Sequence, residues 1–97
     1  MSDGRSNEKI RIAAVFYGQV QGVGFRYTAS YTAKSLGLAG WVRNEYDGSV
    51  SSEIQGDRRS IEEFIRRIQG GRFIDITHTE CREIPVDPDD RSFKVKY

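Results

Sequence analysis

The sequence predicts an α+β fold in which two helices cover one face of an antiparallel sheet. Three observations support this prediction: five short segments have strand composition, two segments repeat apolar residues at helical spacing, and an Asp-Gly pair separates two of the strands. The resulting order is β-α-β-β-α-β with a short extra C-terminal strand. This order is typical of the ferredoxin-like sandwich.

The first strand and the first helix lie on either side of a glycine-rich stretch. The strand is expected over about Lys9–Tyr17, where β-branched and aromatic residues form a nearly continuous apolar run that suits a central position in the sheet. The first helix follows the glycine-rich stretch and is expected to end at Gly37. The helix stripe has spacings of i, i+3, i+4, i+7, i+8 and i+11 and consists of Phe25, Thr28, Ala29, Thr32, Ala33 and Leu36.

Two strands follow, at about Leu38–Tyr46 and Ser49–Gln55. The pair Asp47-Gly48 between them is a strong hairpin signal, because glycine accepts the positive φ that tight turns require. The two strands are therefore expected to pair directly.

The second helix is predicted from the spacing of Ile61, Phe64, Ile65 and Ile68, and it ends at Gly70-Gly71. Its start is open: Ser60 and Glu63 have capping-box spacing, and Asp57 is an equally good first residue. Its polar face offers two pairs at i, i+4 spacing, Glu62–Arg66 and Glu63–Arg67.

The C-terminal part carries two further strands. Alternation over residues 73–84 predicts the fourth, and a turn containing Pro85 and Pro88 precedes a short terminal strand, Ser92–Lys96. In the fourth strand, His78 is expected on the surface, and Cys81 is expected to be a small buried or half-buried residue.

Length and charge indicate one domain, residues 9–97, after a disordered tail, residues 1–8. The net charge of +1 with interspersed signs gives no broad field for a nucleic acid or a membrane. The single Cys81 cannot form an internal disulfide, and the single His78 leaves a zinc site without its usual partners. The N-terminal residues lack the apolar segment of a signal peptide. We therefore expect a cytoplasmic protein without a bound metal.

The stretch GQVQGVGFR, from Gly18 to Arg26, predicts a local anion site. Its three glycines allow successive N–H groups to converge, and the helix that opens at Phe25 has unpaired N–H groups in its first turn. Arg26 adds a planar, permanently charged fork that can bind two phosphate oxygens. The simpler alternative is a tight strand-to-helix connection with a solvated arginine. The spacing matches neither G-x-x-x-x-G-K-[ST] nor G-x-G-x-x-G, which disfavours nucleotide binding.

A nucleic-acid function is also disfavoured. The segment QGVGFRY loosely matches the RNA-recognition signature [KR]-G-[FY]-[GA]-F-V-x-[FY], but that signature belongs on the third strand, where its aromatic residues stack on bases. Here the segment connects the first strand to the first helix, and the third strand contains no aromatic residue.

The motifs together resemble the acylphosphatase family. GQVQGVGFR, then LGLAGWVRN, DGSV and QG, correspond to the family patterns G-x-V-Q-G-V-x-F-R, L-G-L-x-G-W-V-x-N, G-x-V and [QE]-G. The resemblance covers about Ile10 to Tyr97 and is most specific from Gly18 to Gly56. It implies a sheet order of 4-1-3-2 with the terminal strand at an edge, and a monomer.

The resemblance also implies an activity: hydrolysis of acyl phosphates to a carboxylate and inorganic phosphate, without a metal or cofactor. Arg26 would hold the phosphoryl group, and Asn44 would orient the attacking water. Asn44 shares strand parity with Val42 and should point toward the core face, although an asparagine near a hairpin is also ordinary. A non-catalytic anion-binding or regulatory module of the same fold is the alternative. The backbone amides that would cradle the phosphate belong to Gln21, Gly22, Val23, Gly24, Phe25 and Arg26.

Overall fold

The computed structural model of the 97-residue chain describes residues 8–22, 24–70 and 74–97. Four expectations therefore fall outside the described residues: the tail over residues 1–7, the cradle amide of Val23, the helix end at Gly71 and the start of the fourth strand at residue 73. Within the described ranges, no helix is long and apolar enough to cross a membrane.

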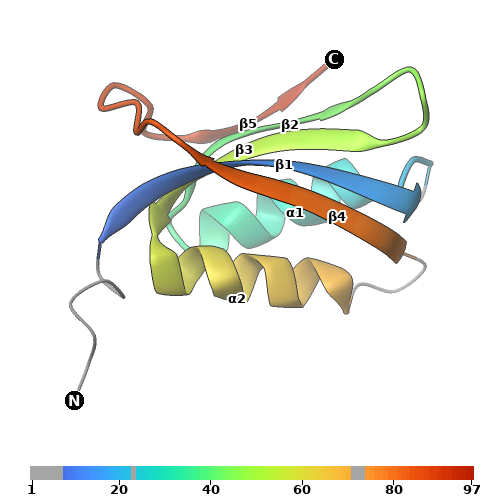
Figure 1. The fold of residues 1–97 in the computed structure, drawn as a ribbon, viewed down its shortest axis with the longest axis horizontal. Helices are drawn as coiled ribbons and strands as arrows, with labels where there is room; N and C mark the ends of the chain where they lie inside the picture. Colours follow the sequence, from blue (N-terminus) through green and yellow to red (C-terminus); the bar gives the residue numbers. More distant parts are fainter. Residues whose placement is uncertain (1–7, 23, 71–73) are drawn as a thin grey trace.

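The sheet has the order β4-β1-β3-β2-β5, and both helices lie on one of its faces (Figure 1). β5 runs parallel to β2, and the other neighbouring strands are antiparallel. These findings confirm the ferredoxin-like fold, the 4-1-3-2 order and the terminal strand at an edge. The elements are β1 (Lys9–Gln19), α1 (Phe25–Ser35), β2 (Ala39–Asn44), β3 (Val50–Asp57), α2 (Arg58–Gln69), β4 (Asp75–Ile84) and β5 (Phe93–Lys96).

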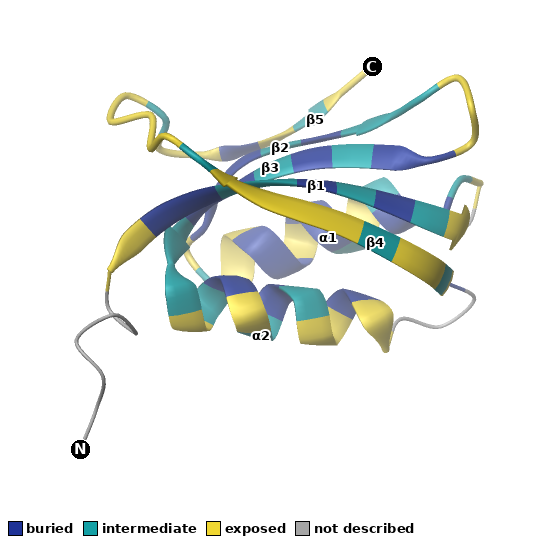
Figure 2. Ribbon diagram, in the orientation of Figure 1, coloured by how far each residue is buried: buried dark blue, intermediate teal, exposed yellow. Residues whose placement is uncertain are grey.

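The core fills the space between the helices and the sheet (Figure 2). Phe16 of β1 packs against Phe25 of α1 with ring centroids 5.3 Å apart. Ala29 and Ala33 of α1 are only 1% and 0% exposed, and their short side chains allow the helix to lie close to the sheet. The predicted stripes of both helices are therefore confirmed as core faces.

The start of α2 decides between the two sequence alternatives. The Asp57 carboxylate accepts a hydrogen bond from the Ser60 N–H at 2.8 Å, so Asp57 is the cap and the helix begins at Arg58. The expected Ser60–Glu63 capping box is wrong, because Ser60 already lies inside the first turn. Glu63 instead forms ion pairs with both Arg66 and Arg67. The expected Glu63–Arg67 pair is therefore confirmed, whereas Arg66 pairs with Glu63 and not with Glu62 as expected.

Arg11 is buried on the sheet face that the helices leave uncovered. Its side chain donates to Glu53 at 2.9 Å and to Asp90 at 2.9 Å, and it also reaches the Gln55 carboxamide at 3.2 Å. Gln55 is 1% exposed and donates to the carbonyls of Asp87 and Asp90. These bonds hold the connection between β4 and β5 against the sheet, and they thereby set the position of β5 beside β2.

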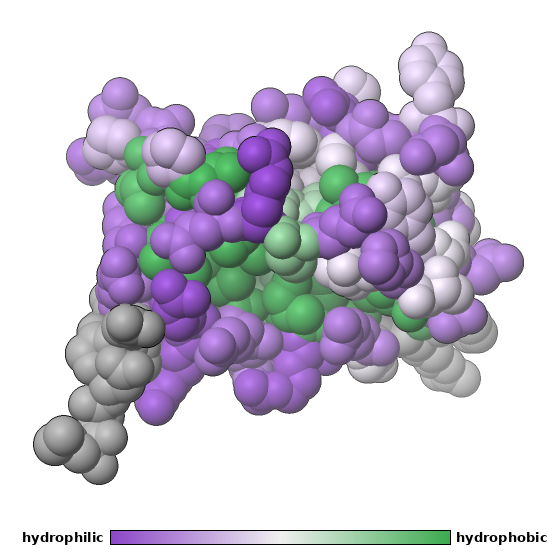
Figure 3. Space-filling view, viewed as in Figure 1, coloured by the Kyte–Doolittle hydropathy of each residue, from purple (hydrophilic) through white to green (hydrophobic). Residues whose placement is uncertain are grey.

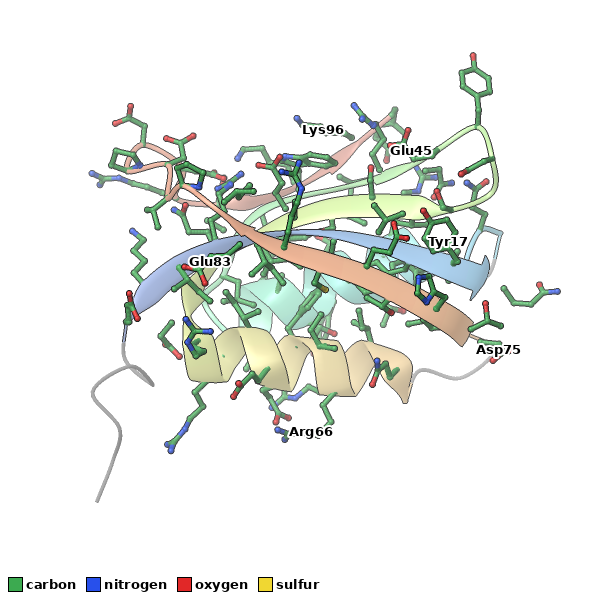
Figure 4. The ribbon with its side chains drawn as sticks, in the orientation of Figure 1. Tyr17, Glu45, Arg66, Asp75, Glu83 and Lys96 are labelled. Atoms are coloured by element: carbon green, nitrogen blue, oxygen red, sulfur yellow. The ribbon has the colours of Figure 1, made fainter. Side chains whose placement is uncertain are left out.

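The edge strand β4 is exposed along most of its length (Figure 2). His78 is exposed as expected, but the expectation of a buried or half-buried Cys81 is wrong. Cys81 lies opposite Ala14, on the side of the sheet that carries the helices, yet the edge position leaves it open to solvent. At the start of α2, Arg58 lies 3.5 Å from Glu83, which is labelled in Figure 4.

An apolar strip is visible below β4 in the space-filling view (Figure 3). It corresponds to a shallow cavity lined by Ile10 and Ile12 of β1 and by Ile61 and Ile65 of α2. Ile10 and Ile61 belong to the buried core, and the partly buried Ile12 and Ile65 pack against it at its outer margin.

The Arg11–Asp90 contact predicts an acid-sensitive contribution to stability. Burial acts to raise the pKa of Asp90, but hydrogen bonds from Lys94 and Arg11 outweigh it and hold that pKa below its usual value. A depressed pKa stabilises the fold above the unfolded value, about 3.9, and this contribution is lost as the pH falls through the folded value. In urea unfolding, Asp90→Asn should be less stable than wild type at pH 7, and the difference should shrink below about pH 4. A difference that stays constant down to pH 2.5 would count against this role of Asp90.

Candidate active site

Gly18 belongs to the sheet and not to the anion-binding turn. β1 continues to Gln19, two residues beyond the expected end, and its register with β4 shifts between Tyr17 and Gly18. Gly18 has a φ of 125°, and a Cβ placed there would lie 2.1 Å from the Asp75 carbonyl oxygen. The expectation that Gly18 helps to form the cradle is therefore wrong: it permits the close approach of β4.

The turn between β1 and α1 places a glycine at the N-cap of the helix. Gly22 and Gly24 have φ values of 75° and 78°, and Gly24 occupies the N-cap position. Among the residues that the structure describes, no side chain caps the helix, and the first turn contains no acidic residue. The N–H groups of a first helical turn lack intrahelical partners, so this turn presents free donors and a positive helix end. An oxyanion is the ligand that suits such a site.

Arg26 lies in this first turn, close to the end of β5. Its Nη1 donates to the Lys96 carbonyl at 3.5 Å, and its guanidinium carbon lies 5.0 Å from the centroid of the Tyr97 ring. Within the described ranges, no acidic side chain forms an ion pair with it. The guanidinium is thus positioned by the end of β5 while it remains available to an anion.

Asn44 is the last residue of β2, at the entrance to the hairpin turn. Its neighbour at the same parity, Val42, is 0% exposed, as expected for the core-facing side. The Asn44 Oδ1 atom is buried and has no hydrogen-bond partner in the part of the chain that the structure describes. A buried acceptor without a partner is costly in a folded protein, so this atom is a strong candidate for contact with water or a ligand.

These groups converge on one cavity of about 240 Å³. Five of the predicted site residues line it: Gly22, Gly24, Phe25, Arg26 and Asn44. The side chain of Gln21 instead donates a hydrogen bond to the Glu45 carbonyl. None of the described residues that line the cavity is acidic. The cavity can therefore hold a small oxyanion between a helix N-terminus and an arginine, with a free amide oxygen beside it. The lining residues are Val20, Gly22, Gly24, Phe25, Arg26, Tyr27, Asn44, Val95 and Tyr97.

Sequence reasoning missed Val20, Tyr27, Val95 and Tyr97 as lining residues. Tyr97 is 97% exposed as a whole but still borders the cavity through its position beside Arg26. The alternation within the terminal strand could have indicated that Val95 faces inward. No pattern in the sequence indicates Tyr97, because its place depends on the pairing of β5 with β2.

The acidic residues of the adjacent hairpin are held away from the cavity. Hydrogen bonds from Ser51 and Arg43 hold the pKa of Glu45 below its usual value, and those from Ser49 lower the pKa of Asp47. Figure 4 shows Glu45 on the side of the sheet away from the helices. The carboxylate next to Asn44 in the sequence is therefore charged but directed away from the anion site.

Comparisons with known proteins agree with this fold. The family model described as acylphosphatase matches residues 12–95. A curated acylphosphatase of Oceanobacillus iheyensis is 42% identical over 82 residues, which are 82% of this chain and 90% of that protein. The crystal structure of acylphosphatase from Bacillus subtilis superposes with a TM-score of 0.85 at 30% identity, covering 91% of this chain and 99% of that one. The structure of full-length HypF also matches, with a TM-score of 0.84 at 30% identity, but only 13% of that chain is covered.

The two glycine environments predict different costs for alanine. At Gly24 a Cβ would meet no heavy atom within 4 Å, so Gly24→Ala should cost about 1–2 kcal/mol, from the left-handed backbone alone. Gly18→Ala should cost more, because its Cβ would also collide with the β4 backbone. Urea unfolding of both variants measures this order. Equal losses of stability would contradict the bulge at Gly18.

Proposed function

The chain belongs to the acylphosphatase family, whose members are hydrolases of acid anhydrides, and we propose which of its residues hydrolyse an acyl phosphate. The substrate is a carboxyl phosphate, and the products are a carboxylate and inorganic phosphate. One observation carries the assignment of residues: Arg26, the start of α1 and the Asn44 Oδ1 atom, which has no hydrogen-bond partner among the described residues, line the same cavity.

The phosphoryl group is held at the start of α1 in this proposal. The amides of the turn, expected from Gln21 to Arg26, donate to its oxygens, and Arg26 adds two donors in a planar fork. Both the helix N-terminus and the guanidinium are positive, and they lie where no described lining residue is acidic. This end of the site therefore favours an anion with several oxygens.

Such a site needs no general acid. The leaving group is a carboxylate whose conjugate acid has a pKa of about 4, so it departs unprotonated at neutral pH. Phosphoryl transfer passes through a loose transition state, and catalysis consists largely of positioning and charge stabilisation. Arg26 and the amides stabilise the charge on the equatorial oxygens.

Asn44 holds the attacking water. Its free Oδ1 can accept a hydrogen bond from that water, which directs a lone pair of the water oxygen toward phosphorus. The proton of the water passes to an oxygen of the phosphoryl group itself. With charge supplied by Arg26 and the amides, the mechanism calls for no metal or cofactor.

The cellular setting is part of the same proposal. We assign the chain to the cytoplasm as a single-domain monomer, residues 9–97, that acts on a small molecule and binds neither nucleic acid nor membrane. Support comes from the single cysteine, which cannot form an internal disulfide, and from the balanced charge of +1.

Hydrolysis of benzoyl phosphate in the presence of a metal chelator tests the proposal. Wild type should turn over, and folded Arg26→Ala should lose at least about 10³-fold in rate, as expected for an arginine that stabilises a transferring phosphoryl group. Absence of turnover by a folded wild type would refute the proposed activity and favour the alternative, an anion-binding module of the same fold.

Replacement of Arg26 by lysine separates charge from geometry. Arg26→Lys keeps the charge but loses the bidentate fork. We expect kcat to fall and the inhibition constant for inorganic phosphate to rise roughly tenfold, the cost of one charged hydrogen bond. An unchanged inhibition constant would indicate that Arg26 does not hold the phosphate.

Removal of the Asn44 amide should affect turnover alone. Asn44→Ala is expected to lower kcat by about 100-fold, because the attacking water loses its orientation, while the inhibition constant for phosphate changes little. A large loss of phosphate affinity would instead assign Asn44 to the phosphate cradle.

A further inference from the structure

The two halves of the site come from segments that are separated in the sequence. The phosphate-binding turn precedes α1, whereas Asn44 ends β2, and the whole of α1 lies between them in the sequence. The proposed mechanism depends on the distance between these halves, because the water on Asn44 must lie in line with the phosphoryl group held by the turn. A contact across the gap would fix this distance.

Gln21 makes such a contact. Its side-chain Nε2 donates to the Glu45 carbonyl at 2.7 Å and to the Ser49 carbonyl at 2.8 Å. Glu45 directly follows Asn44, and Ser49 directly precedes β3. One amide group of the turn therefore bonds to both sides of the hairpin, immediately beyond the strand end that carries Asn44.

The partner of Gln21 is itself well fixed. The Glu45 N–H donates to the Ser49 carbonyl at 2.9 Å, and the Gly48 N–H donates to the Glu45 carbonyl at 3.3 Å. The Asp47 carboxylate accepts from the Ser49 N–H at 2.9 Å. The hairpin turn is thus closed by its own hydrogen bonds, and Gln21 adds two further bonds to it from outside.

A primary amide suits the chemistry of this contact. Both acceptors are carbonyl oxygens, which cannot donate, so the group between them must supply two hydrogens. The carboxamide of glutamine does so without a charge, whereas a carboxylate of the same size would offer only acceptors. Two bonds from one planar group fix orientation as well as distance.

We propose that Gln21 is a positioning residue, whose carboxamide sets the place of the phosphate-binding turn relative to Asn44. This inference rests on the proposed roles of Arg26 and Asn44. Without the two bonds, the turn and the hairpin can shift against each other, and a displacement of about 1 Å in an active site can cost 100-fold in rate. The phosphate would still be bound, because Arg26 and the start of α1 are unchanged.

The test is a double-mutant cycle with benzoyl phosphate as substrate and inorganic phosphate as inhibitor. Gln21→Met has nearly the same length and no donors, and Gln19→Met, an exposed residue of β1, is the matched control. Gln21→Met should lower kcat at least tenfold and change the inhibition constant for phosphate less than threefold, whereas Gln19→Met should change neither. In an Asn44→Ala background, Gln21→Met should lower kcat less than threefold, because the water that it positions is already lost.

The opposite results would overturn the inference. One is an unchanged kcat in Gln21→Met. The other is an equal loss of kcat in the wild-type and Asn44→Ala backgrounds together with a matching rise in the inhibition constant for phosphate, which would make Gln21 only a support of the phosphate-binding turn. Should Gln21→Met fold poorly, Gln21→Asn keeps the donors but is too short to reach both carbonyls, and the same split between kcat and inhibition applies.

The same variants show whether the inference about Gln21 fails alone or together with the proposed function. An inactive wild type, or an Asn44→Ala variant as fast as wild type, refutes the proposed roles and the inference with them. An active wild type that depends on Asn44 but not on Gln21 refutes the inference alone.

Discussion

The close packing of α1 against the sheet is the constraint on which the rest of the site depends. Ala29 and Ala33 face the sheet with side chains too short to hold the helix away from it. The start of the helix consequently lies at the end of β2, where Asn44 interrupts the row of core residues. A helix with larger residues at these positions would separate its N-terminus from Asn44, and the cavity between them would no longer exist.

The negative charges near the cavity are held in local contacts outside it. The acidic residues near the site are used in local contacts: Glu45 with Ser51 and Arg43, and Asp47 with Ser49. Asp90 is engaged with Arg11 and Lys94. The field in the cavity is then set by Arg26 and by the helix end, which explains how a chain with almost no net charge can present a positive site.

Local patterns in the sequence predicted the elements of the fold, because the periods of buried residues are intrinsic to helices and strands. The pairing of Arg26 with Asn44 came instead from the resemblance to the family motifs; both residues line one cavity, and their roles stay a proposal. Three features were beyond the local patterns: the bulge at Gly18, the contact of Tyr97 with Arg26 and the bonds of Gln21 to the hairpin. Each joins segments distant in the sequence, so no local pattern could carry it. The cap at Asp57 is a different case. Asp57 and Ser60 both satisfied the sequence rules for the first residue of α2, and the hydrogen bond from the Ser60 N–H to Asp57 decided between them.

The free edge of β4 has a consequence for the behaviour of the protein in concentrated solution. The outer edge of a strand of this length offers its backbone to a second molecule, and such edges are common starting points for aggregation. Glu80, Arg82 and Glu83 place charges along this edge, and charged side chains discourage intermolecular strand pairing. The polarity of β4, which contributes little to the core, therefore disfavours strand pairing between molecules at this edge.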